Sequence, residues 1–246
     1  MSARIDYNTK GSSYDTDKAG YIYPVGSTAD KFVVTKVTPF NLYNEDEYLF
    51  KRVQDAWPAT TTTYLGDETL TNYVVDTKTN LKDNTNTLTY LSPIAADMST
   101  SDYVQTMSSV SAAAKFNDAN GNENIIIAYP KENTLMPESQ LMKYATGIAF
   151  QGDYYNNGND TNTPDERRIY YYFLRHQGEL VSGAYQAVYY SDLTGNESCG
   201  TVPMNFGIVR NNIYRVSIEG MTEDAKLILH IKVKKWDLFE HESIYM

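Results

Sequence analysis

Side chains able to carry out nucleophilic, acid–base or metal chemistry are few in this 246-residue sequence and lie far apart. The three histidines are His176, His230 and His241, and no two of them have the His-x-x-x-His spacing of a helical zinc site. The single cysteine, Cys199, lies in a Gly/Asn/Ser-rich segment without the flanking signature of a cysteine nucleophile. We therefore expect no catalytic, cofactor or metal site here, and we expect the histidines to be polar surface residues.

Carboxylates are abundant, and they leave one enzymatic alternative open. Two converging Asp or Glu side chains can hydrolyse a glycosidic bond, but the 31 acidic residues show no pair by number alone. Asp118, Asn120 and Asn122 stand at alternate positions as in a calcium loop, yet Glu123 occupies the place where such a loop requires glycine. A plain β-turn is the preferred interpretation of this segment.

Tyrosine is the most unusual feature of the composition, with 22 residues spread along the chain. Tyr170, Tyr171 and Tyr172 are consecutive, so in a strand their rings point alternately to opposite faces. Exposed rings would form aromatic platforms for sugar or protein contacts. The preferred interpretation is that they pack in a half-buried sheet, for which tyrosine is well suited.

The charge balance argues against nucleic acid as a partner. The chain has 21 Lys and Arg against 31 Asp and Glu, a net charge of −10, so phosphate backbones are not attracted to it in general. The cluster of Lys232, Lys234 and Lys235 is typical of a solvated strand face. No run of about 20 apolar residues predicts a membrane span, and the first residues lack the apolar core of a signal peptide.

Apolar residues recur mostly with a period of two, which predicts strands with one buried face. In 226–237, the side chains of Leu227, Leu229, Ile231 and Val233 share one face, and those of His230, Lys232 and Lys234 share the other. The other predicted strands are 31–38, 87–91, 125–130, 144–154, 168–176, 184–190 and 212–219.

Helical periodicity is sparse. In 101–116, Val104, Met107, Val110 and Ala114 recur at three- and four-residue spacing, which predicts one helix. The segment 45–57 fits a short helix or a strand equally well. With no repeat and no long linker in the chain, the residue pattern predicts one all-β domain, a β-sandwich with one or two short helices.

Three segments, in the order in which they occur here, resemble the C-terminal half of the Bacteroidales fimbrillins, the type V pilins. The first is 3–7 followed by 32–50, the second is 127–154, and the third comprises 170–176 and 208–221. The residues that carry the resemblance, and for which a structural role is expected, are Glu132, Asn133, Thr134, Arg175, Arg210, Asn211, Asn212 and Tyr214. No part of the chain resembles the family's N-terminal domain.

The resemblance implies a transthyretin-like, Greek-key β-sandwich and a non-catalytic role. It implies export as a lipoprotein to the cell surface, assembly into a fimbrium (pilus) at the outer membrane by strand donation, and support of adhesion. The partners would be other fimbrial subunits and, for adhesion, host or bacterial surface proteins or glycans. The alternative is a carbohydrate-binding adhesin module.

Three parts of the chain follow from this interpretation. Residues 1–15 would be a connector or the end of a missing N-terminal domain, 16–237 the β-sandwich, and 238–246 a tail that is the candidate donor strand. The tail could equally pair within its own domain, because self-pairing and donation use the same backbone groups. The proposed polymerisation strand contains Ile231, Val233, Trp236, Leu238, Phe239, Ile244 and Tyr245.

Overall fold

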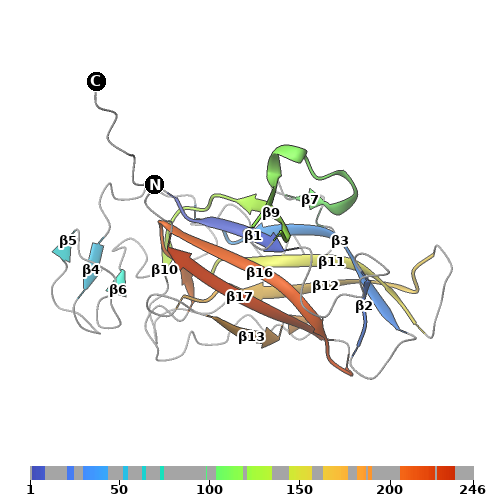
Figure 1. Ribbon diagram of the computed structural model, residues 1–246. Coiled ribbons are helices and arrows are strands. Elements are labelled where there is room, and N and C mark those ends of the chain that lie inside the picture. Colours follow the sequence, from blue (N-terminus) through green and yellow to red (C-terminus); the bar gives the residue numbers. More distant parts are fainter. Residues whose placement is uncertain are drawn as a thin grey trace.

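The structure is a computed structural model of residues 1–246 and is dominated by two β-sheets (Figure 1). It describes residues 2–8, 21–24, 30–43, 98, 104–118, 121–134, 144–156, 163–176, 206–224 and 226–235, and the short strands at 52–54, 63–64, 73–74, 182–186 and 188–189. Everything below concerns these residues.

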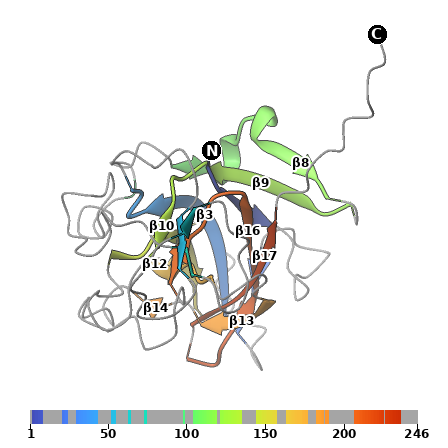
Figure 2. The same cartoon turned by 90° about the vertical axis from the view of Figure 1, so that its left-hand side faces the viewer.

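The first sheet has six strands in the order β13-β17-β16-β1-β9-β8. Its strands are β13 (Ser182–Gln186), β17 (Leu227–Lys235), β16 (Asn212–Met221), β1 (Arg4–Asn8), β9 (Glu123–Ala128) and β8 (Lys115–Asn117). All pairings are antiparallel except that of β1 with β16, which is parallel. Figure 2 shows β9 and β8 continuing this sheet above β16 and β17.

The second sheet has the order β14-β12-β11-β3-β2, and β7 also pairs with β3. Its strands are β14 (Val188–Tyr189), β12 (Glu166–Phe173), β11 (Gly147–Tyr155), β3 (Lys31–Phe40), β2 (Tyr21–Ile22) and β7 (Gln105–Thr106). Two small sheets accompany it. They are β10 (Asn133–Thr134) with β15 (Gly207–Ile208), and β4 (Arg52–Gln54) between β5 (Thr63–Tyr64) and β6 (Tyr73–Val74).

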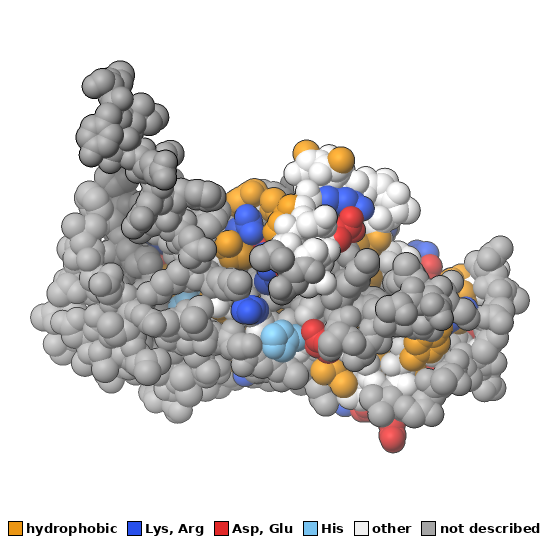
Figure 3. All heavy atoms as spheres, viewed as in Figure 1, with side chains coloured by type: hydrophobic (Ala, Val, Ile, Leu, Met, Phe, Trp, Pro, Cys, Tyr) orange, Lys and Arg blue, Asp and Glu red, His pale blue; other side chains and the backbone are white. Residues whose placement is uncertain are grey.

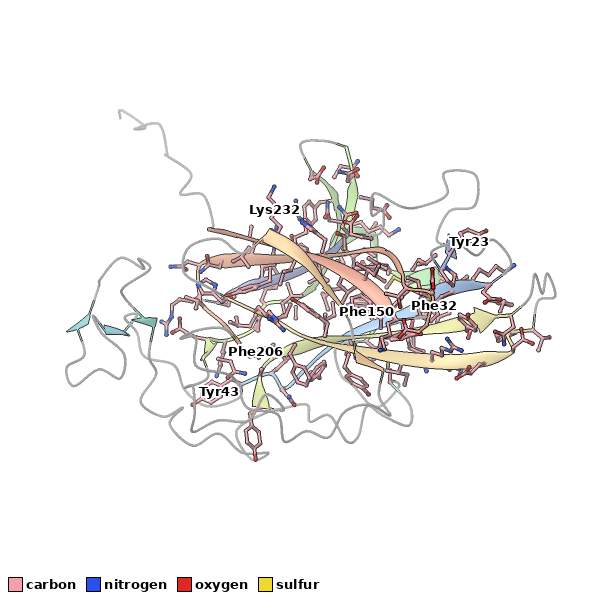
Figure 4. The ribbon with its side chains drawn as sticks, turned by 90° about the horizontal axis from the view of Figure 1, so that it is seen from below. Tyr23, Phe32, Tyr43, Phe150, Phe206 and Lys232 are labelled. Carbon is pink, nitrogen blue, oxygen red and sulfur yellow. The ribbon has the colours of Figure 1, made fainter. Side chains whose placement is uncertain are left out.

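The main core lies between the two large sheets, so the predicted all-β sandwich is confirmed. From the first sheet, the predicted inward row of β17 is buried: Leu227, Leu229, Ile231 and Val233 are at most 1% exposed. On the opposite face Lys232 is exposed and His230 is half-buried. Figure 4 shows Phe32 and Phe150 in the interior and Lys232 pointing away from it. The period of two therefore determined which face of β17 is buried.

A second core covers the outer face of the β11–β12 sheet. There Phe40, Ala149 and Tyr171 pack with Met98 and Val104, which come from the chain between β3 and β7. Because β12 is buried on both faces, Tyr170 and Tyr172 fill the main core while Tyr171 fills the second one. All three rings are at most 3% exposed. They form no exposed aromatic platform, and the packing interpretation is the correct one.

Two glycines of β11 allow the aromatic rings of β3 to lie against the backbone. A Cβ at Gly152 would lie 2.2 Å from Phe32 Cζ, and a Cβ at Gly147 would lie 2.2 Å from Phe40 Cζ. Both distances are far below van der Waals contact, and the added Cβ atoms would also lie 2.4 Å from Val33 O and 2.6 Å from Tyr172 O, so only glycine fits without a shift of both ring and backbone. These two contacts face opposite cores, since Phe32 belongs to the main core and Phe40 to the second.

The helix predicted for 101–116 is wrong. The described part of this segment forms β7, two 3-10 turns at Met107–Ser109 and Ala112–Ala114, and β8, and no α-helix occurs among the described residues. The apolar residues of this segment do not form one helical face, because they pack on two different cores. Val104 packs on the second core, and Met107, Val110 and Ala114 pack on the main one. Ser111 Oγ also accepts a hydrogen bond from Ala113 N (3.3 Å) and so caps the second of these 3-10 turns. Of 45–57, residues 52–54 form β4, and the rest lies outside the described residues.

Of the other predicted strands, 87–91 lies outside the described residues, and 184–190 is not one strand but two, β13 and β14, which belong to different sheets; the remaining ones coincide with observed strands. The segment at 117–124 is the predicted turn: Gly121 N donates to Asp118 O (2.9 Å) and Asn122 N donates to Asp118 Oδ1 (3.0 Å). The start of the domain needs correction, since residues 4–8 form a central strand of the first sheet and belong to the sandwich. No helix in the described part of the chain is long and apolar enough to cross a membrane.

Candidate functional site

Five of the eight residues singled out in the sequence meet in a buried polar network at one end of the sandwich: Glu132, Asn133, Arg210, Asn212 and Tyr214. Glu132 follows β9, and Arg210 lies in the turn between β15 and β16. Arg210 Nη2 and Nε lie 2.8 Å and 3.0 Å from Glu132 Oε2, and Arg210 N donates to Glu132 Oε1 (3.2 Å). The two side chains are 4% and 3% exposed, so they form a buried ion pair that fixes this turn against the end of β9.

The turn itself depends on two asparagines. Asn211 has φ +63°, in the left-handed region that asparagine tolerates better than most residues. Its N–H donates to Ser2 O (3.2 Å), just before β1. Asn212 Nδ2 donates to Val209 O (3.3 Å) and to Arg210 O (3.1 Å), and these two bonds stabilise the turn. These contacts bring β15, β16 and the start of β1 together.

Tyr214 continues the network into the core. Its hydroxyl oxygen accepts a hydrogen bond from Val209 N (2.8 Å), so its own hydrogen is available to His176 Nδ1, 2.8 Å away. Which of the two atoms donates depends on the histidine tautomer, and the arrangement that we expect has the Tyr214 hydroxyl as donor and His176 Nδ1 as acceptor. Burial raises the pKa of Tyr214 well above its ordinary value of 10.0, and the Glu132 carboxylate raises it further. The phenol therefore stays protonated and acts as a structural donor.

His176 corrects the expectation that the histidines are surface residues. It is fully buried after β12 and contacts the Tyr214 ring, with centroids 5.8 Å apart. The neighbouring Arg175 lies over the Phe206 ring at 4.8 Å, and their backbones form an isolated bridge. Figure 4 shows Phe206 at the same end of the molecule as Tyr43. The residues Arg175 and His176 thus connect β12 to the segment leading into β15.

A second set of buried amides and hydroxyls completes this end. Asn133 Nδ2 donates to Thr146 Oγ1 (2.7 Å) and to Asn41 O (3.3 Å), and Thr146 Oγ1 donates to Asn41 O (2.9 Å). Asn41 has φ +52° and donates from Nδ2 to Ala145 O (3.0 Å). The end of β3 is thereby joined to the start of β11. For Thr134, the structure gives only the pairing of its backbone with Gly207.

Sequence reasoning missed Asn41, Thr146 and His176 as members of this network. Asn41 carried a weak signal, because asparagine after an apolar strand is a frequent turn residue. For Thr146 and His176 no local signal exists, since their partners are 105 and 38 positions away. We call the whole set the end network: Asn41, Glu132, Asn133, Thr146, His176, Arg210, Asn212 and Tyr214.

The end network has the properties of a structural site. Its named members are buried and bonded to one another or to backbone groups, as buried polar groups must be to offset their loss of water. Among the described residues, no group of three or more His, Cys, Asp or Glu side chains could hold a metal ion. The contacts of the end network fix the ends of several strands to one another.

A second polar cluster lies on the outer face of the first sheet, on β1, β16 and the β8–β9 hairpin. Asp6 is 0% exposed, and its carboxylate lies 2.9 Å from Arg4 Nη2 and 3.3 Å from Arg215 Nη2. Arg215 Nη1 also lies 3.4 Å from Asp118 Oδ2, and both guanidinium groups lie over the Phe116 ring, at 5.0 and 5.5 Å. Burial raises the pKa of Asp6, and the two arginines oppose this increase. Basic side chains on this face are visible in Figure 3.

The residues predicted to form the polymerisation strand have separate positions. Ile231 and Val233 lie in the main core of their own chain, on a strand paired on both sides with β13 and β16. Trp236, Leu238, Phe239, Ile244 and Tyr245 lie outside the described residues. A donated segment built from the predicted strand would therefore begin beyond Lys235.

Comparisons with known proteins add no relative. No protein-family model matches the sequence, no curated protein is significantly similar to it, and no solved structure is significantly similar to this structure. The resemblance to the fimbrillins therefore rests on the motif residues of the sequence.

Proposed function

We propose that this chain is a structural subunit of a cell-surface fimbria, which binds neighbouring subunits by strand donation and supports adhesion. The observation that carries the proposal is the end network. Glu132 of the second motif segment contacts Arg210 of the third directly, and the two parts of the third segment contact each other through Tyr214 and His176. This contact joins the two segments in one structural element, and the assignment to the fimbrillins rests on the resemblance itself.

The sandwich architecture supports the same role. A β-sandwich subunit can bind a partner through backbone groups of an added strand, with alternate side chains of that strand filling apolar positions. Binding of this kind requires a stable fold and no reactive group. The end network, whose side chains bond to one another and to backbone groups of the chain, agrees with this requirement. We place the protein at the outer membrane, exported as a lipoprotein, on the basis of the resemblance.

The carbohydrate-binding alternative was motivated by the tyrosines and the Asn/Gly-rich loops. Of the tyrosines, Tyr170, Tyr171 and Tyr172 are buried and give it no support. Among the described residues, Tyr129 is the one large hydrophobic side chain that is exposed, with 55% of its surface accessible. A single exposed ring does not form a planar row of aromatic rings for sugar binding.

The proposal is tested by deleting residues 238–246 from the full-length gene and examining the cell surface by electron microscopy. If this tail is the donated strand, we expect a folded, exported subunit that no longer enters fimbriae. Replacement of exposed Lys232 by Ala, which alters a neighbouring surface position without removing backbone, serves as the matched control and should leave the fimbriae intact. Normal fimbriae that contain the truncated subunit would exclude the tail as donor, and absence of the protein from any surface filament would contradict the fimbrial role.

A further inference from the structure

The buried histidine His176 lies at the junction of β12 with the turn that precedes β16. It is 0% exposed, and its Nδ1 lies 2.8 Å from the Tyr214 hydroxyl oxygen. The same oxygen accepts a hydrogen bond from Val209 N (2.8 Å), in the segment between β15 and β16. One phenol therefore connects the residues after β12 with the turn at 209–212.

The backbone contacts beside this phenol are short. Gly207 N donates to Leu174 O (3.2 Å), and the backbones of Arg175 and Phe206 form an isolated bridge. The strand β15 has two residues and pairs with the two-residue strand β10. Segment 206–212 is thus held by short pairings together with the side chains of the end network. A segment of this kind opens at a lower free energy than a long ladder such as that of β16 with β17.

The charged side chains described next to the His176–Tyr214 pair are Glu132, Arg210 and Arg175. The Glu132 carboxylate lies 2.8 Å from Arg210 Nη2, so its charge is already compensated. Arg175 directly precedes His176 in the chain and carries a second positive charge. An imidazolium at His176 would add a third cation beside a single carboxylate. These groups therefore favour the neutral form of the buried ring.

Protonation of His176 would change the hydrogen bonds as well as the charge. In the expected arrangement, Nδ1 accepts the hydrogen of the Tyr214 hydroxyl. A protonated ring carries a hydrogen on both nitrogens, so Nδ1 becomes a donor and the Tyr214 hydrogen needs another acceptor. Both the buried charge and a buried donor without its acceptor are costly. Proton uptake is therefore easier when segment 206–212 has separated from the end of β12 and water reaches the ring.

From these observations we propose that the end network is an acid-sensitive latch: neutral His176 holds segment 206–212 against the end of β12, and protonation of His176 releases this segment. The sign follows from proton linkage. An imidazole in water titrates near about pH 6.5, so the open state binds the proton more tightly than the closed state does. The closed state is fully favoured above this pH and is lost as the pH falls below it. This inference goes beyond the proposed function and does not rest on it.

The first test compares the purified whole chain with its His176→Gln variant in urea titrations between about pH 5 and about pH 7.5, the range in which histidine changes its charge. Glutamine can accept a hydrogen bond from Tyr214 but does not titrate. Relative to this variant, we expect the unfolding equilibrium constant of the unmodified chain to rise about tenfold for each pH unit below about 6.5. Carboxylates such as Asp6 are present in both proteins, so their titration cancels in the comparison.

The matched control is His230→Gln, at a half-buried position on the outward face of β17. This variant should keep the pH dependence of the unmodified chain. The same dependence in the unmodified chain and in His176→Gln would overturn the latch.

Amide hydrogen exchange locates the opening. We expect the protection factor of the Val209 N–H to fall when the pH is lowered from about 7.5 to about 5.5. The protection of Leu229 and Ile231, in a strand paired on both sides, should stay unchanged. A general loss of stability in acid would not produce this local difference.

The imidazole NMR signals of the unmodified chain decide the question even if His176→Gln does not fold. A His176 ring that stays neutral for as long as Val209 is protected supports the latch. A ring that becomes protonated near about pH 6.5 while Val209 remains protected would overturn it. Because these measurements use purified protein and leave residues 238–246 in place, either result is independent of the fimbrial proposal.

Discussion

Glu132 Oε2 lies 2.8 Å from Arg210 Nη2 in a pair whose side chains are almost completely buried. The pair joins the end of β9 to the turn before β16, 78 positions further along the chain. A buried carboxylate without its cation is far more costly than an apolar residue in the same place. The stability of this end of the sandwich therefore depends on the presence of both partners.

We predict that Arg210→Met lowers the free energy of unfolding by about 3–5 kcal/mol, because it leaves the Glu132 charge buried and unpaired. The double variant with Glu132→Gln should lose less than the sum of the two single losses, since the partners are directly coupled. Urea denaturation measures both. The exposed pair of Lys115 and Glu123, 3.5 Å apart, is the control, and Glu123→Gln should cost less than about 1 kcal/mol. Additive losses at 132 and 210 would contradict the coupling.

The Tyr214 hydroxyl serves two buried groups, and we predict that Tyr214→Phe costs about 1–3 kcal/mol because Val209 N–H loses its acceptor. The same variant removes the hydrogen donor to His176 Nδ1. In the unmodified protein, nitrogen NMR of the imidazole should show Nε2 protonated and Nδ1 unprotonated. Tyr129→Phe, at an exposed ring, should leave both the stability and the His176 signals nearly unchanged. A protonated Nδ1 at neutral pH would refute this arrangement.

Because Asn211 has a positive φ, substitutions at this position can distinguish the cost of backbone strain from the cost of losing the side chain. We predict that Asn211→Ala lowers the melting temperature, because a Cβ without a compensating polar group costs about 1–2 kcal/mol in the left-handed region. Asn211→Gly should retain most of the stability, since glycine adopts this region without steric cost. Thermal unfolding followed by circular dichroism checks both variants. Equal losses for Ala and Gly would show that the side chain, and not the backbone angle, is what matters.

The raised pKa of Asp6 predicts that the free energy of unfolding depends on pH, with a defined sign. Burial raises its pKa in the folded protein above the ordinary 3.8, so the folded state binds the proton more tightly than the unfolded state does. The stability contributed by this group is present below pH 3.8 and is lost as the pH rises through the folded pKa. We therefore expect the free energy of unfolding of the protein, relative to Asp6→Asn, to decrease as the pH increases through this window.

Asp224 is the control for the sign of this effect. Its hydrogen bond with Thr222 lowers its pKa, so stability relative to Asp224→Asn should rise with pH in the acid range. Urea titrations of the protein and the two variants at several pH values between about 3 and 6 bracket the ordinary carboxyl range. An increase of the Asp6 difference with pH would mean that the arginines outweigh burial.

Local patterns in the sequence were sufficient for the strands and for much of the core. Alternation in 226–237 predicted which face of β17 is buried, because successive side chains of any strand point to opposite sides. The turn residues Asp118, Gly121 and Asn211 were recognisable for the same reason: their backbone angles and bonds are set within a few positions. These features require no knowledge of the remaining chain.

Tertiary structure decided what depends on residues far apart in sequence. Val104 and Met107 looked like one helical face, but they belong to two cores on opposite sides of the second sheet. His176 was expected at the surface, and its remote partner Tyr214 makes it possible to bury it. Asp6 is likewise buried beside Arg215, 209 positions away. The place of β1 between β16 and β9 could not be inferred from residues 1–15, because a strand's own pattern says that it pairs but not with which strand. The pairing of strands is set by the sum of long-range contacts, and no local window of the sequence contains that sum.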